Sequence, residues 1–392
     1  MLRYLLAGES HGPALVGILE GFPAGLIIKN SFVDTELALR QQGYGRGPRM
    51  QSIEKDAVEF LSGFWKGRTL GSPIAFKIPN LDFELRRRTG QKAQRWRVPR
   101  PGHADLAGVV RYDYDDCAPV AERASARSTA ATTAAGACAK ALLREFGITV
   151  FSHTRSVGSI KAAEAEATIA RLRRIRSNRP LRCLDAKAEK EMVALIDAAM
   201  AEGVTLGGEF EVIATGLPVG LGTYCHPDRR LDALLAEDVM AIPAIKAVSI
   251  GAGIEVAAVD GQNAHDELIP AEKRSSGRPS LGGRPTLGSG FVRTTNRAGG
   301  LEGGITNGEP VIVRGFVKPI SSQRKRLQSI DLKTGKPGLA AWVRSDTCVV
   351  PAAGIVGEAV VAWRLASELT TFLGAADLKT MKKRFREISS AK

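Results

Sequence analysis

The sequence predicts an α+β fold, in which helices are layered on antiparallel sheets. Segments with helical and with strand-like patterns are both present, yet they do not alternate as the βαβ units of a parallel sheet would. The glycine-rich fragments do not lie between a strand and a helix, so a Rossmann unit is not indicated. With 392 residues, 44% of them hydrophobic, the chain can bury a large core without disulfides or metals.

The N-terminal segment predicts short strands and one helix. Residues 2–7 are mostly apolar and predict a strand that leads into a glycine-rich loop. Residues 12–28 predict a strand pair around the turn at 21–25, where glycine and proline cluster. Residues 32–42 have helical character, and Gly43 follows as a suitable C-terminal cap.

An alanine-rich segment, residues 119–146, predicts one long helix that ends at Gly147. Its alanine content indicates close packing against other elements. Arg123 and Arg127 are four residues apart and would share one face of this helix. Ser125 lies between them near the helix start, where free N–H groups favour anions. The pattern fits an anion site, and it also fits an ordinary packed helix.

The remaining elements are predicted from apolar periodicity and from short β-rich runs. Length alone would favour two domains, but no low-complexity linker divides the chain. Helices are expected at residues 186–201, 229–240, 352–373 and 378–388, and strands at 204–214, 248–259 and 310–316.

The chain is strongly basic, with a formal net charge of +14. Nucleic acid is the obvious partner for such a charge. The basic residues do not form one tail, however, and few aromatic residues lie among them. Several arginines instead lie beside glycine, as in a pocket that captures small polyanions. The most basic stretch, residues 84–99, is expected to be a flexible, solvated loop or a flap over an anionic site.

The cysteines and the apolar runs exclude several classes of protein. Five cysteines are widely spread without a CxxC motif, so neither a disulfide framework nor a zinc site is expected. No apolar run approaches about 18 residues, so we expect no membrane-spanning helix. The apolar start at residues 2–7 is too short for a secretory signal, and we therefore expect a cytoplasmic protein.

Two of the five histidines lie in glycine-containing loops. His11 belongs to the segment Gly-Glu-Ser-His-Gly at 8–12, and His103 to Arg-Pro-Gly-His-Ala-Asp at 100–105. Glycine lets a large ligand approach the backbone closely, and histidine transfers protons near neutral pH. The pair therefore indicates an active site. The alternative is that both histidines only form local hydrogen bonds.

Further segments suggest a ligand with several negative groups. Guanidinium groups bind carboxylate and phosphate with two parallel hydrogen bonds. The glycine-dense segment 294–308 can hold phosphate or a flat ring, and Lys318 to Ser322 add a cation and two hydroxyls. Asp346 could pair with an arginine, or it could orient or accept a proton from a cofactor. The candidate arginines, which could also be surface charges, are Arg40, Arg46, Arg49, Arg100, Arg127 and Arg344.

Taken together and in order, these segments resemble the chorismate synthase family. The resemblance extends from near the N-terminus to about residue 365. Its segments are Gly-Glu-Ser-His-Gly at 8–12, Gly-Tyr-Gly-Arg-Gly at 43–47 with Arg49, Arg-Pro-Gly-His-Ala-Asp at 100–105, Arg-Ala-Ser-Ala-Arg at 123–127, Ala-Gly-Gly-Leu-Glu-Gly-Gly at 298–304, Lys-Pro-Ile-Ser-Ser at 318–322 and Arg-Ser-Asp-Thr-Cys at 344–348.

The resemblance implies a reaction and an architecture. In this family 5-enolpyruvylshikimate 3-phosphate loses phosphate and a C6 hydrogen by 1,4-anti elimination and becomes chorismate, the last common intermediate of the shikimate pathway to aromatic amino acids. Reduced FMN is required although no net oxidation occurs, and NADPH is a possible reductant. The resemblance implies one domain over residues 1–392, built as a β-α-β sandwich with a C-terminal helical tail at 374–392. It also implies a homotetramer, with no nucleic-acid or membrane partner.

The resemblance also implies roles for single residues. His11 would protonate the departing phosphate, His103 would keep the reduced flavin in its working protonation state, and Asp346 would act near flavin N5. Ser10 and Ser125 would support the proton relay. The substrate-binding residues would be Arg40, Arg46, Arg49, Arg100, Arg127 and Arg344. The cofactor-binding residues would be Arg40 and Arg46 for NADP, and Arg123, Ala124, Ser125, Pro243, Ala244, Gly303, Lys318, Pro319, Ile320, Ser321, Ser322 and Arg344 for FMN.

Two other functions stay open on the residues alone. A nucleic-acid-binding protein would explain the net charge and predicts strongly salt-dependent binding. A plain NAD(P)H:flavin oxidoreductase would explain the flavin loops, but it needs neither paired histidines nor so many arginines. Ala124, Pro243 and Ala252 differ from residues common in the family, and these differences touch the flavin contacts more than the proton relay.

Overall fold

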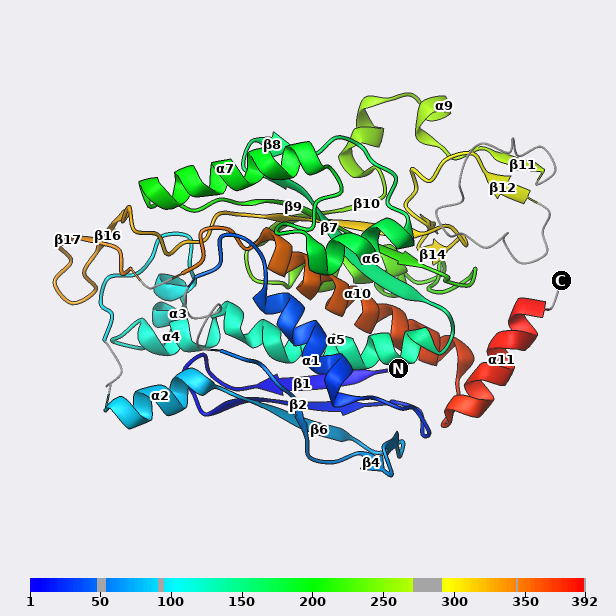
Figure 1. Ribbon diagram of the computed structural model, residues 1–392, viewed down its shortest axis with the longest axis horizontal. Coiled ribbons are helices and arrows are strands. Elements are labelled where there is room, and N and C mark those ends of the chain that lie inside the picture. Colours follow the sequence, from blue (N-terminus) through cyan, green and yellow to red (C-terminus); the bar gives the residue numbers. More distant parts are fainter. Residues whose placement is uncertain (48–53, 91–94, 271–290, 343–344, 391–392) are drawn as a thin grey trace.

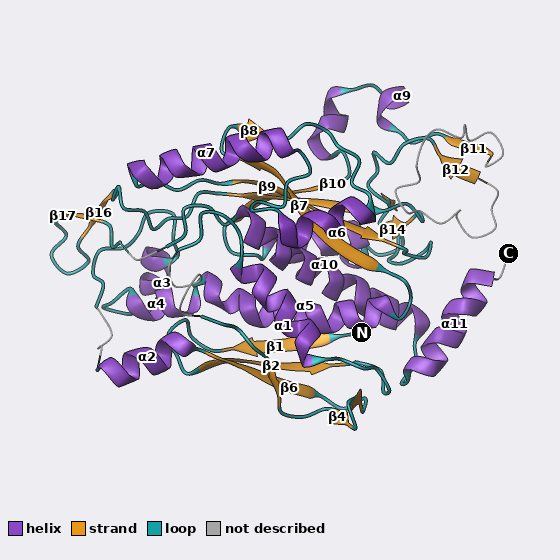
Figure 2. Cartoon of the chain, in the orientation of Figure 1, coloured by secondary structure: helices purple, strands orange, loops and turns teal. Residues whose placement is uncertain are grey.

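Two antiparallel sheets enclose a layer of helices (Figure 1). The computed structural model describes residues 1–47, 54–90, 95–270, 291–342 and 345–390. Figure 2 shows the helical layer between the sheets, with α7 (Ala186–Glu202) beyond the larger sheet; α6 (Ile169–Asn178) packs against Phe151 and Ile213 of that sheet. The predicted α+β class and the β-α-β sandwich are confirmed.

The smaller sheet has the strand order β1-β2-β6-β3. These strands are β1 (Arg3–Ala7), β2 (Ala14–Glu20), β6 (Ile74–Pro79) and β3 (Glu59–Phe60). The predicted strand at 2–7 is confirmed, but the predicted strand pair within 12–28 is wrong. β2 pairs with β1 and β6 instead, because the segment after it is held elsewhere: Leu26 N donates to Thr69 Oγ1 (2.9 Å).

The larger sheet has the strand order β10-β15-β9-β7-β8. Its strands are β10 (Ile245–Ile250), β15 (Val311–Val317), β9 (Gly208–Thr215), β7 (Thr149–Val157) and β8 (Ile160–Lys161). The strand expected over 248–259 is wrong beyond Ile250. Gly251 has a left-handed backbone (φ 58°), which ends the strand, and Gly253–Ala258 then forms a 3-10 helix.

Two helices, α5 (Thr129–Arg144) and α10 (Val350–Leu373), form the centre of the molecule. They approach so closely that a Cβ at Gly136 would lie 2.3 Å from the Cβ of Ala359. α10 is long and apolar enough to cross a membrane by length and composition, yet 94% of that stretch is buried inside the protein. α10 is therefore the core helix of the sandwich, as its position in Figure 1 shows.

The predicted continuous helix over 119–146 is wrong. The chain forms α4 (Ala118–Arg123), a 3-10 turn at Ala126–Ser128, and then α5. Ser125 lies between them with an extended backbone, and its hydroxyl accepts a hydrogen bond from Arg127 N (3.2 Å). The serine hydroxyl thus replaces a carbonyl oxygen of the helix as the acceptor for this backbone N–H, and the helix breaks here. Arg123 and Arg127 consequently do not share one helical face.

The basic stretch 84–99 is not a loop throughout. Residues 84–89 belong to α2 (Leu81–Thr89), so the expected loop is wrong over these residues. The helix forms because Asp82 and Glu84 lie in its first turn and three arginines in its last turn, where each charge complements the helix dipole. Gly90 ends the helix in a left-handed conformation.

Most of the other predicted elements are confirmed within a few residues. They are α1 (Asn30–Gln41), α7, α8 (Leu231–Met240), α10, α11 (Leu378–Ser390), β9 and β15.

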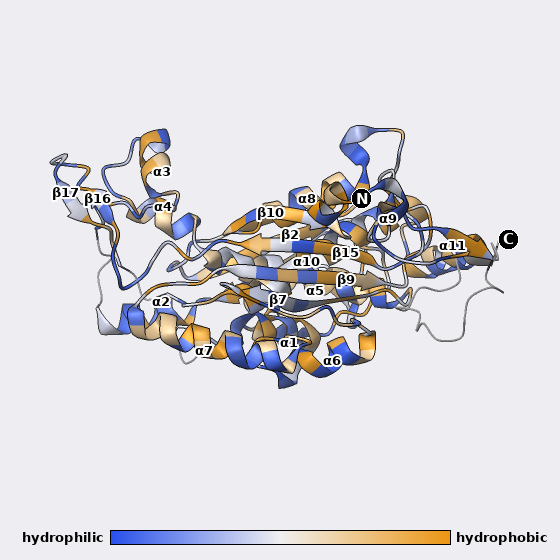
Figure 3. Cartoon of the chain, turned by 90° about the horizontal axis from the view of Figure 1, so that it is seen from above, coloured by the Kyte–Doolittle hydropathy of each residue, from blue (hydrophilic) through white to orange (hydrophobic). Residues whose placement is uncertain are grey.

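Figure 3 shows α3 (Asp105–Tyr112), α4 and the hairpin of β16 (Gln328–Ile330) and β17 (Pro337–Leu339) at one end of the molecule. Smaller elements are the pairs β4 (Phe64–Trp65) with β5 (Arg68–Thr69), β11 (Leu268–Pro270) with β12 (Phe291–Arg293) and β13 (Leu301–Glu302) with β14 (Ile305–Thr306), and α9 (Gly261–Ala264).

Three buried charged side chains, Lys140, Glu36 and Glu358, meet the half-buried Arg176 where α1, α5, α6 and α10 come together. Lys140 of α5 donates to Glu36 of α1 (2.6 Å) and to Glu358 of α10. Arg176 of α6 donates to the same two carboxylates, at 2.6 Å each. Glu358 also accepts hydrogen bonds from Ser152 of β7. Burial works against the charged form of Glu358, but the cations outweigh it and lower its pKa to about 2.

The lowered pKa of Glu358 predicts an acid-sensitive fold. The stabilisation from this group is complete above its ordinary pKa and is lost as the pH falls from about 4.5 towards 2. Glu358→Gln should lower the free energy of unfolding at pH 7 by about 3–5 kcal/mol and flatten its dependence on pH in that window. Urea unfolding at several pH values measures both effects. The exposed Glu302→Gln is the control, with a loss below about 1 kcal/mol; an equal loss in both variants would contradict the prediction.

Candidate active site

The first predicted histidine lies against a carboxylate. Nδ1 of His11 is 2.6 Å from Glu122 Oε1, and the His11 backbone N donates to Glu122 Oε2 (2.7 Å). On the other side of the ring, Nε2 lies 3.8 Å from Asp82 Oδ2 at the start of α2. Partial burial works against the charge of Glu122, but the hydrogen bonds from His11 outweigh it and lower the pKa of Glu122. Glu122 is therefore an ionised acceptor.

The two predicted serines are brought together beside this ring. Ser125 Oγ donates to Ser10 Oγ (3.0 Å), although the residues are 115 positions apart. Asn80 joins both segments: its Nδ2 donates to Gly12 O (2.7 Å), and its Oδ1 accepts from Arg127 Nε (2.8 Å). Ser10, His11, Asn80, Glu122, Ser125 and Arg127 are called the His11 group below.

Buried carboxylates neutralise the predicted arginines of this region. Arg127 Nη1 donates to Asp56 Oδ1 (2.6 Å), and Arg40 Nη1 donates to Asp56 Oδ2 (3.4 Å). Arg40 also donates to Thr129 Oγ1 (2.9 Å) and to Ala126 O (3.0 Å), so all three of its nitrogens have protein partners. Arg127 Nη2, in contrast, is buried without a hydrogen-bond partner, 3.7 Å from Glu54 Oε2. The charge of Arg127 is therefore balanced by two buried carboxylates, Asp56 and Glu54.

A second group joins Arg46 to Asp346. Arg46 Nη1 donates to Asp346 Oδ2 (2.6 Å), and Gly47 N donates to Asp346 Oδ1 (2.6 Å). Burial lowers the pKa of Arg40 to about 10, although the neighbouring Asp56 carboxylate opposes this shift. The charges of Arg46 and Asp346 also act on Arg40. Arg40 in turn shares the Asp56 carboxylate with Arg127 of the His11 group, so the two groups are neighbours.

The third group surrounds His103. Its Nδ1 is 2.6 Å from Asp105 Oδ1, and Arg100 donates to both oxygens of Asp105, at 2.7 and 2.9 Å. Burial works against the charge of Asp105, but Arg100 and His103 lower its pKa well below the usual range. Lys318 Nζ donates to Gly102 O, which joins the 318–322 segment to this loop.

The comparison with known proteins agrees with this geometry. A sequence model of the family described as chorismate synthase matches residues 2–370. The chorismate synthase of Desulforamulus reducens is 48% identical over 395 residues, which cover 99% of this chain and 98% of that protein. The chain belongs to the chorismate synthase family. Its membership identifies it as a carbon–oxygen lyase of aromatic amino-acid biosynthesis, in a family that requires reduced flavin.

Other relatives and a solved structure agree with this assignment to the chorismate synthase family. The chorismate synthase of Bacillus cytotoxicus is 47% identical over 387 residues, which cover 95% of each protein. A crystal structure of chorismate synthase superposes with a TM-score of 0.78 at 36% identity and covers 100% of this chain and 98% of that one. The fold, as well as the motifs, is therefore that of the family.

The residues expected to bind flavin lie in several places. Lys318 N donates to the carbonyl of Ala244 (2.9 Å), so the expected 243–244 and 318–322 contacts are adjacent. Ala244 has a left-handed backbone (φ 73°), which is uncommon for a residue with a side chain and is often found at functional sites. Arg123 donates to the carbonyls of Leu6 and Gly8, beside the His11 loop, and Ala124 caps α4.

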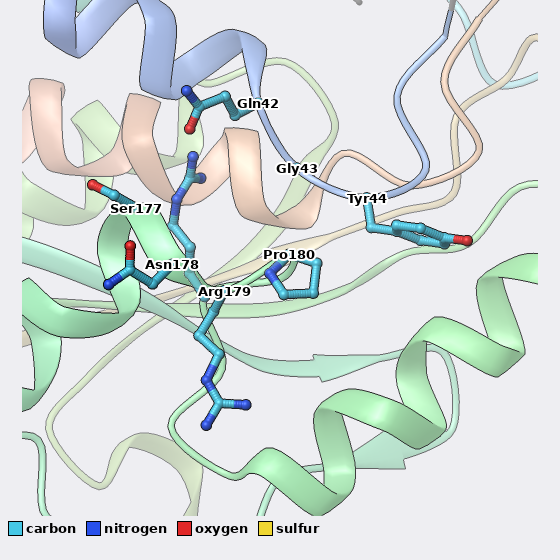
Figure 4. A pocket seen from close by; sticks show the side chains of 8 residues that line it. Gln42, Gly43, Tyr44, Ser177, Asn178, Arg179 and Pro180 are labelled. Carbon is cyan, nitrogen blue, oxygen red and sulfur yellow. The ribbon is translucent and has the colours of Figure 1, made fainter.

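Not all expected contacts are brought together. Gly303 lies in the turn between β13 and β14, and Figure 1 shows β14 well away from α3. Arg49 and Arg344 lie outside the described residues. A cavity of about 380 Å³ is lined by Gly43 and Tyr44, which begin the Gly-Tyr-Gly-Arg-Gly segment, and by residues 177–180 on the other side (Figure 4). Neither predicted histidine lines it.

The sequence motifs did not single out several residues of the site. Glu54, Asp56 and Asn80 lie outside every motif, and Glu122 lies one residue before one of them. Asp105 is in a motif, but its pairing with Arg100 and His103 was not expected. The useful signal would have been the excess of arginines itself, because a buried guanidinium needs a carboxylate partner.

Because Asp56 pairs with two buried arginines, we expect its substitution to lower the stability of the fold. Asp56→Asn removes the negative charge between Arg40 and Arg127 while it keeps the shape of the side chain. The free energy of unfolding should fall by about 3–5 kcal/mol, measured by urea denaturation at pH 7. Asp113→Asn is the matched control, because Asp113 is exposed and asparagine tolerates its left-handed backbone; its effect should be below about 0.5 kcal/mol. Equal effects in the two variants would contradict the role of Asp56.

Proposed function

We propose that the chain eliminates phosphate from 5-enolpyruvylshikimate 3-phosphate to form chorismate with His11 as the proton donor to the departing phosphate. Phosphate and a C6 hydrogen leave the substrate in this 1,4-anti elimination, without net oxidation. The observation that supports the role of His11 is its bond to Glu122: Nδ1 lies 2.6 Å from the carboxylate, so a proton exchanged with the substrate would pass through Nε2, the other ring nitrogen. Reduced FMN, when bound, would supply electron density for the loss of phosphate.

The His11 group also supports a proton relay. The hydroxyls of Ser10 and Ser125 are 3.0 Å apart, and Ser10 directly precedes His11 in the chain. A hydroxyl is both a donor and an acceptor, so this pair can pass a proton on and reset. Arg127 Nη2 makes no hydrogen bond and is 3.7 Å from Glu54, and in this proposal the guanidinium helps to hold a phosphate or carboxylate of the substrate.

The residues of the other two groups fit a reduced flavin. Lys318, Ser321 and the left-handed Ala244 lie together and offer a cation, a hydroxyl and backbone groups for phosphate and for ring carbonyls. His103, held by Asp105, would keep the reduced ring in its working protonation state. Asp346, which accepts a hydrogen bond from Arg46, would hold or accept a proton near flavin N5.

The reductant, the assembly and the location belong to the same proposal. NADPH is the proposed source of electrons, with Arg40 and Arg46 at its expected site. A homotetramer is supported by the apolar outer face of the smaller sheet, where Leu5, Ile18 and Val16 are 70%, 46% and 42% exposed. In an oligomer, the turn with Gly303 could also complete a flavin site in another copy. Five free thiols support a cytoplasmic protein.

An anaerobic assay tests the proposed reaction. The purified chain is mixed with 5-enolpyruvylshikimate 3-phosphate and chemically reduced FMN, and chorismate absorbance and released phosphate are followed. We expect equal amounts of both products, and none with oxidised FMN alone. Addition of NADPH to oxidised FMN tests whether the chain reduces its own flavin. Folded protein that forms no product with reduced FMN would contradict the proposal and favour a plain flavin oxidoreductase.

Three substitutions test the proposed residues. His11→Ala, His103→Ala and Asp346→Asn should each lower kcat by about 10²–10⁴, the usual contribution of a group that transfers protons. Ligand binding, followed by fluorescence titration, should persist because these side chains carry little of the binding energy. His265→Ala is the control, since His265 lies at the end of α9 rather than in any of the three groups, and its kcat should be unchanged. Near-normal turnover in all three variants would show that the roles are wrong.

A further inference from the structure

Glu122 holds His11 by two bonds at once. Its two carboxylate oxygens face two different nitrogens of His11, the ring Nδ1 at 2.6 Å and the backbone N at 2.7 Å. Its own carbonyl accepts from Ser10 N (3.0 Å), so Glu122 contacts the His11 loop through backbone and side chain. A side chain that binds both the ring and the backbone of one residue restrains the position of that ring and its rotation.

The carboxylate also decides where the ring carries its hydrogen. The pKa of Glu122 is lowered, so the group is ionised and can only accept hydrogen bonds. The Nδ1 atom, 2.6 Å from this carboxylate, must then carry a hydrogen, and in the singly protonated ring Nε2 carries no hydrogen. Nε2 consequently gains and loses the proton that is exchanged with a ligand, while Nδ1–H keeps its bond to Glu122.

We propose that Glu122 is the positioning residue for His11: it orients the imidazole and keeps the hydrogen on Nδ1, so that the ring exchanges its proton through Nε2. The proposal rests on the proposed role of His11 as the proton donor. Glu122 does not touch the reacting atoms in this arrangement, because the imidazole ring lies between its carboxylate and Nε2. The role resembles that of any carboxylate that orients a histidine base or acid through its second nitrogen.

The local fold explains why this position can hold a carboxylate so firmly. Glu122 is in the last turn of α4, a short helix with proline in its first turn. Its neighbour Arg123 donates to the carbonyls of Leu6 and Gly8, which binds the end of α4 to the strand before the His11 loop. From the opposite side, Asn80 donates to Glu9 O (3.2 Å) and Gly12 O (2.7 Å). The loop is therefore held on both sides, with the imidazole against Glu122.

Glu122→Gln is the decisive substitution. Glutamine has the same shape but offers one oxygen and one NH₂ group, whereas two N–H donors of His11 face this side chain. One donor loses its acceptor, or the ring moves its hydrogen to Nε2. We expect kcat to fall by about 10²-fold or more, while KM changes less than about threefold, because substrate contacts are untouched. Glu122→Asp, which keeps the charge, should recover part of the lost kcat.

Glu189→Gln is the matched control. Glu189 is a more deeply buried carboxylate than Glu122, and it too accepts backbone hydrogen bonds, from Leu181 N and Cys183 N, and pairs with Arg179. It lies outside the three groups of the site. This variant should lose stability but keep the kcat of the wild type, measured on protein shown to be folded by circular dichroism. A loss of kcat that is specific to Glu122→Gln therefore cannot arise from a missing buried carboxylate in general.

A measurement on the unmodified chain makes the proposal independent of how the variants fold. Nitrogen-15 NMR of the imidazole, assigned with His11→Ala, reports which ring nitrogen carries the hydrogen. We expect Nδ1–H in the neutral ring of His11. A neutral ring with its hydrogen on Nε2, or a Glu122→Gln enzyme with kcat within about threefold of wild type, would overturn the proposal. If His11→Ala itself keeps full activity, the proposed role of His11 fails instead, so the two failures are distinguishable.

Discussion

The close contact between α5 and α10 is the constraint on which the rest of the structure depends. Gly136 permits it, because any side chain there would overlap Ala359. The same contact brings Lys140 and Glu358 together, and Glu36, Arg176 and Ser152 complete their hydrogen bonds. Buried charges destabilise a fold unless each is paired, so this cluster also restricts how α1, α6 and β7 are arranged around the helix pair. The two sheets then cover the helical layer on opposite sides.

The site is built directly on this core. α5 begins at Thr129, whose hydroxyl accepts from Arg40, and the turn before it carries Ser125 and Arg127. The break between α4 and α5, which sequence periodicity did not predict, is what lets Ser125 reach Ser10 and lets Glu122 reach His11. A continuous helix would place these side chains one turn apart on a rigid rod. Here the loss of helical hydrogen bonds is offset by bonds within the site.

Carboxylates explain how so basic a chain can bury its arginines. Asp56, Asp105 and Asp346 each bind one or two guanidinium groups, and Glu122 and Asp105 each bind a histidine ring. The pKa values of Glu122 and Asp105 are both lowered by these partners, so both histidines face an ionised acceptor at Nδ1. The two rings thus share one feature: in each, Nδ1 lies against a carboxylate at 2.6 Å.

The sequence by itself determined the fold class, the helices with strong apolar periodicity such as α7 and α10, and the motifs that identify the family, because these signals are local. It also pointed to His11, His103 and most of the arginines through their glycine neighbours. Only the tertiary structure decided the strand pairing of β2, the break at Ser125, and the partners Asp56, Asn80 and Glu122, which come from segments far from the residues they hold. The physical reason is that hydrogen-bond and charge pairing depends on distance in space, whereas periodicity reports only which side of an element is buried.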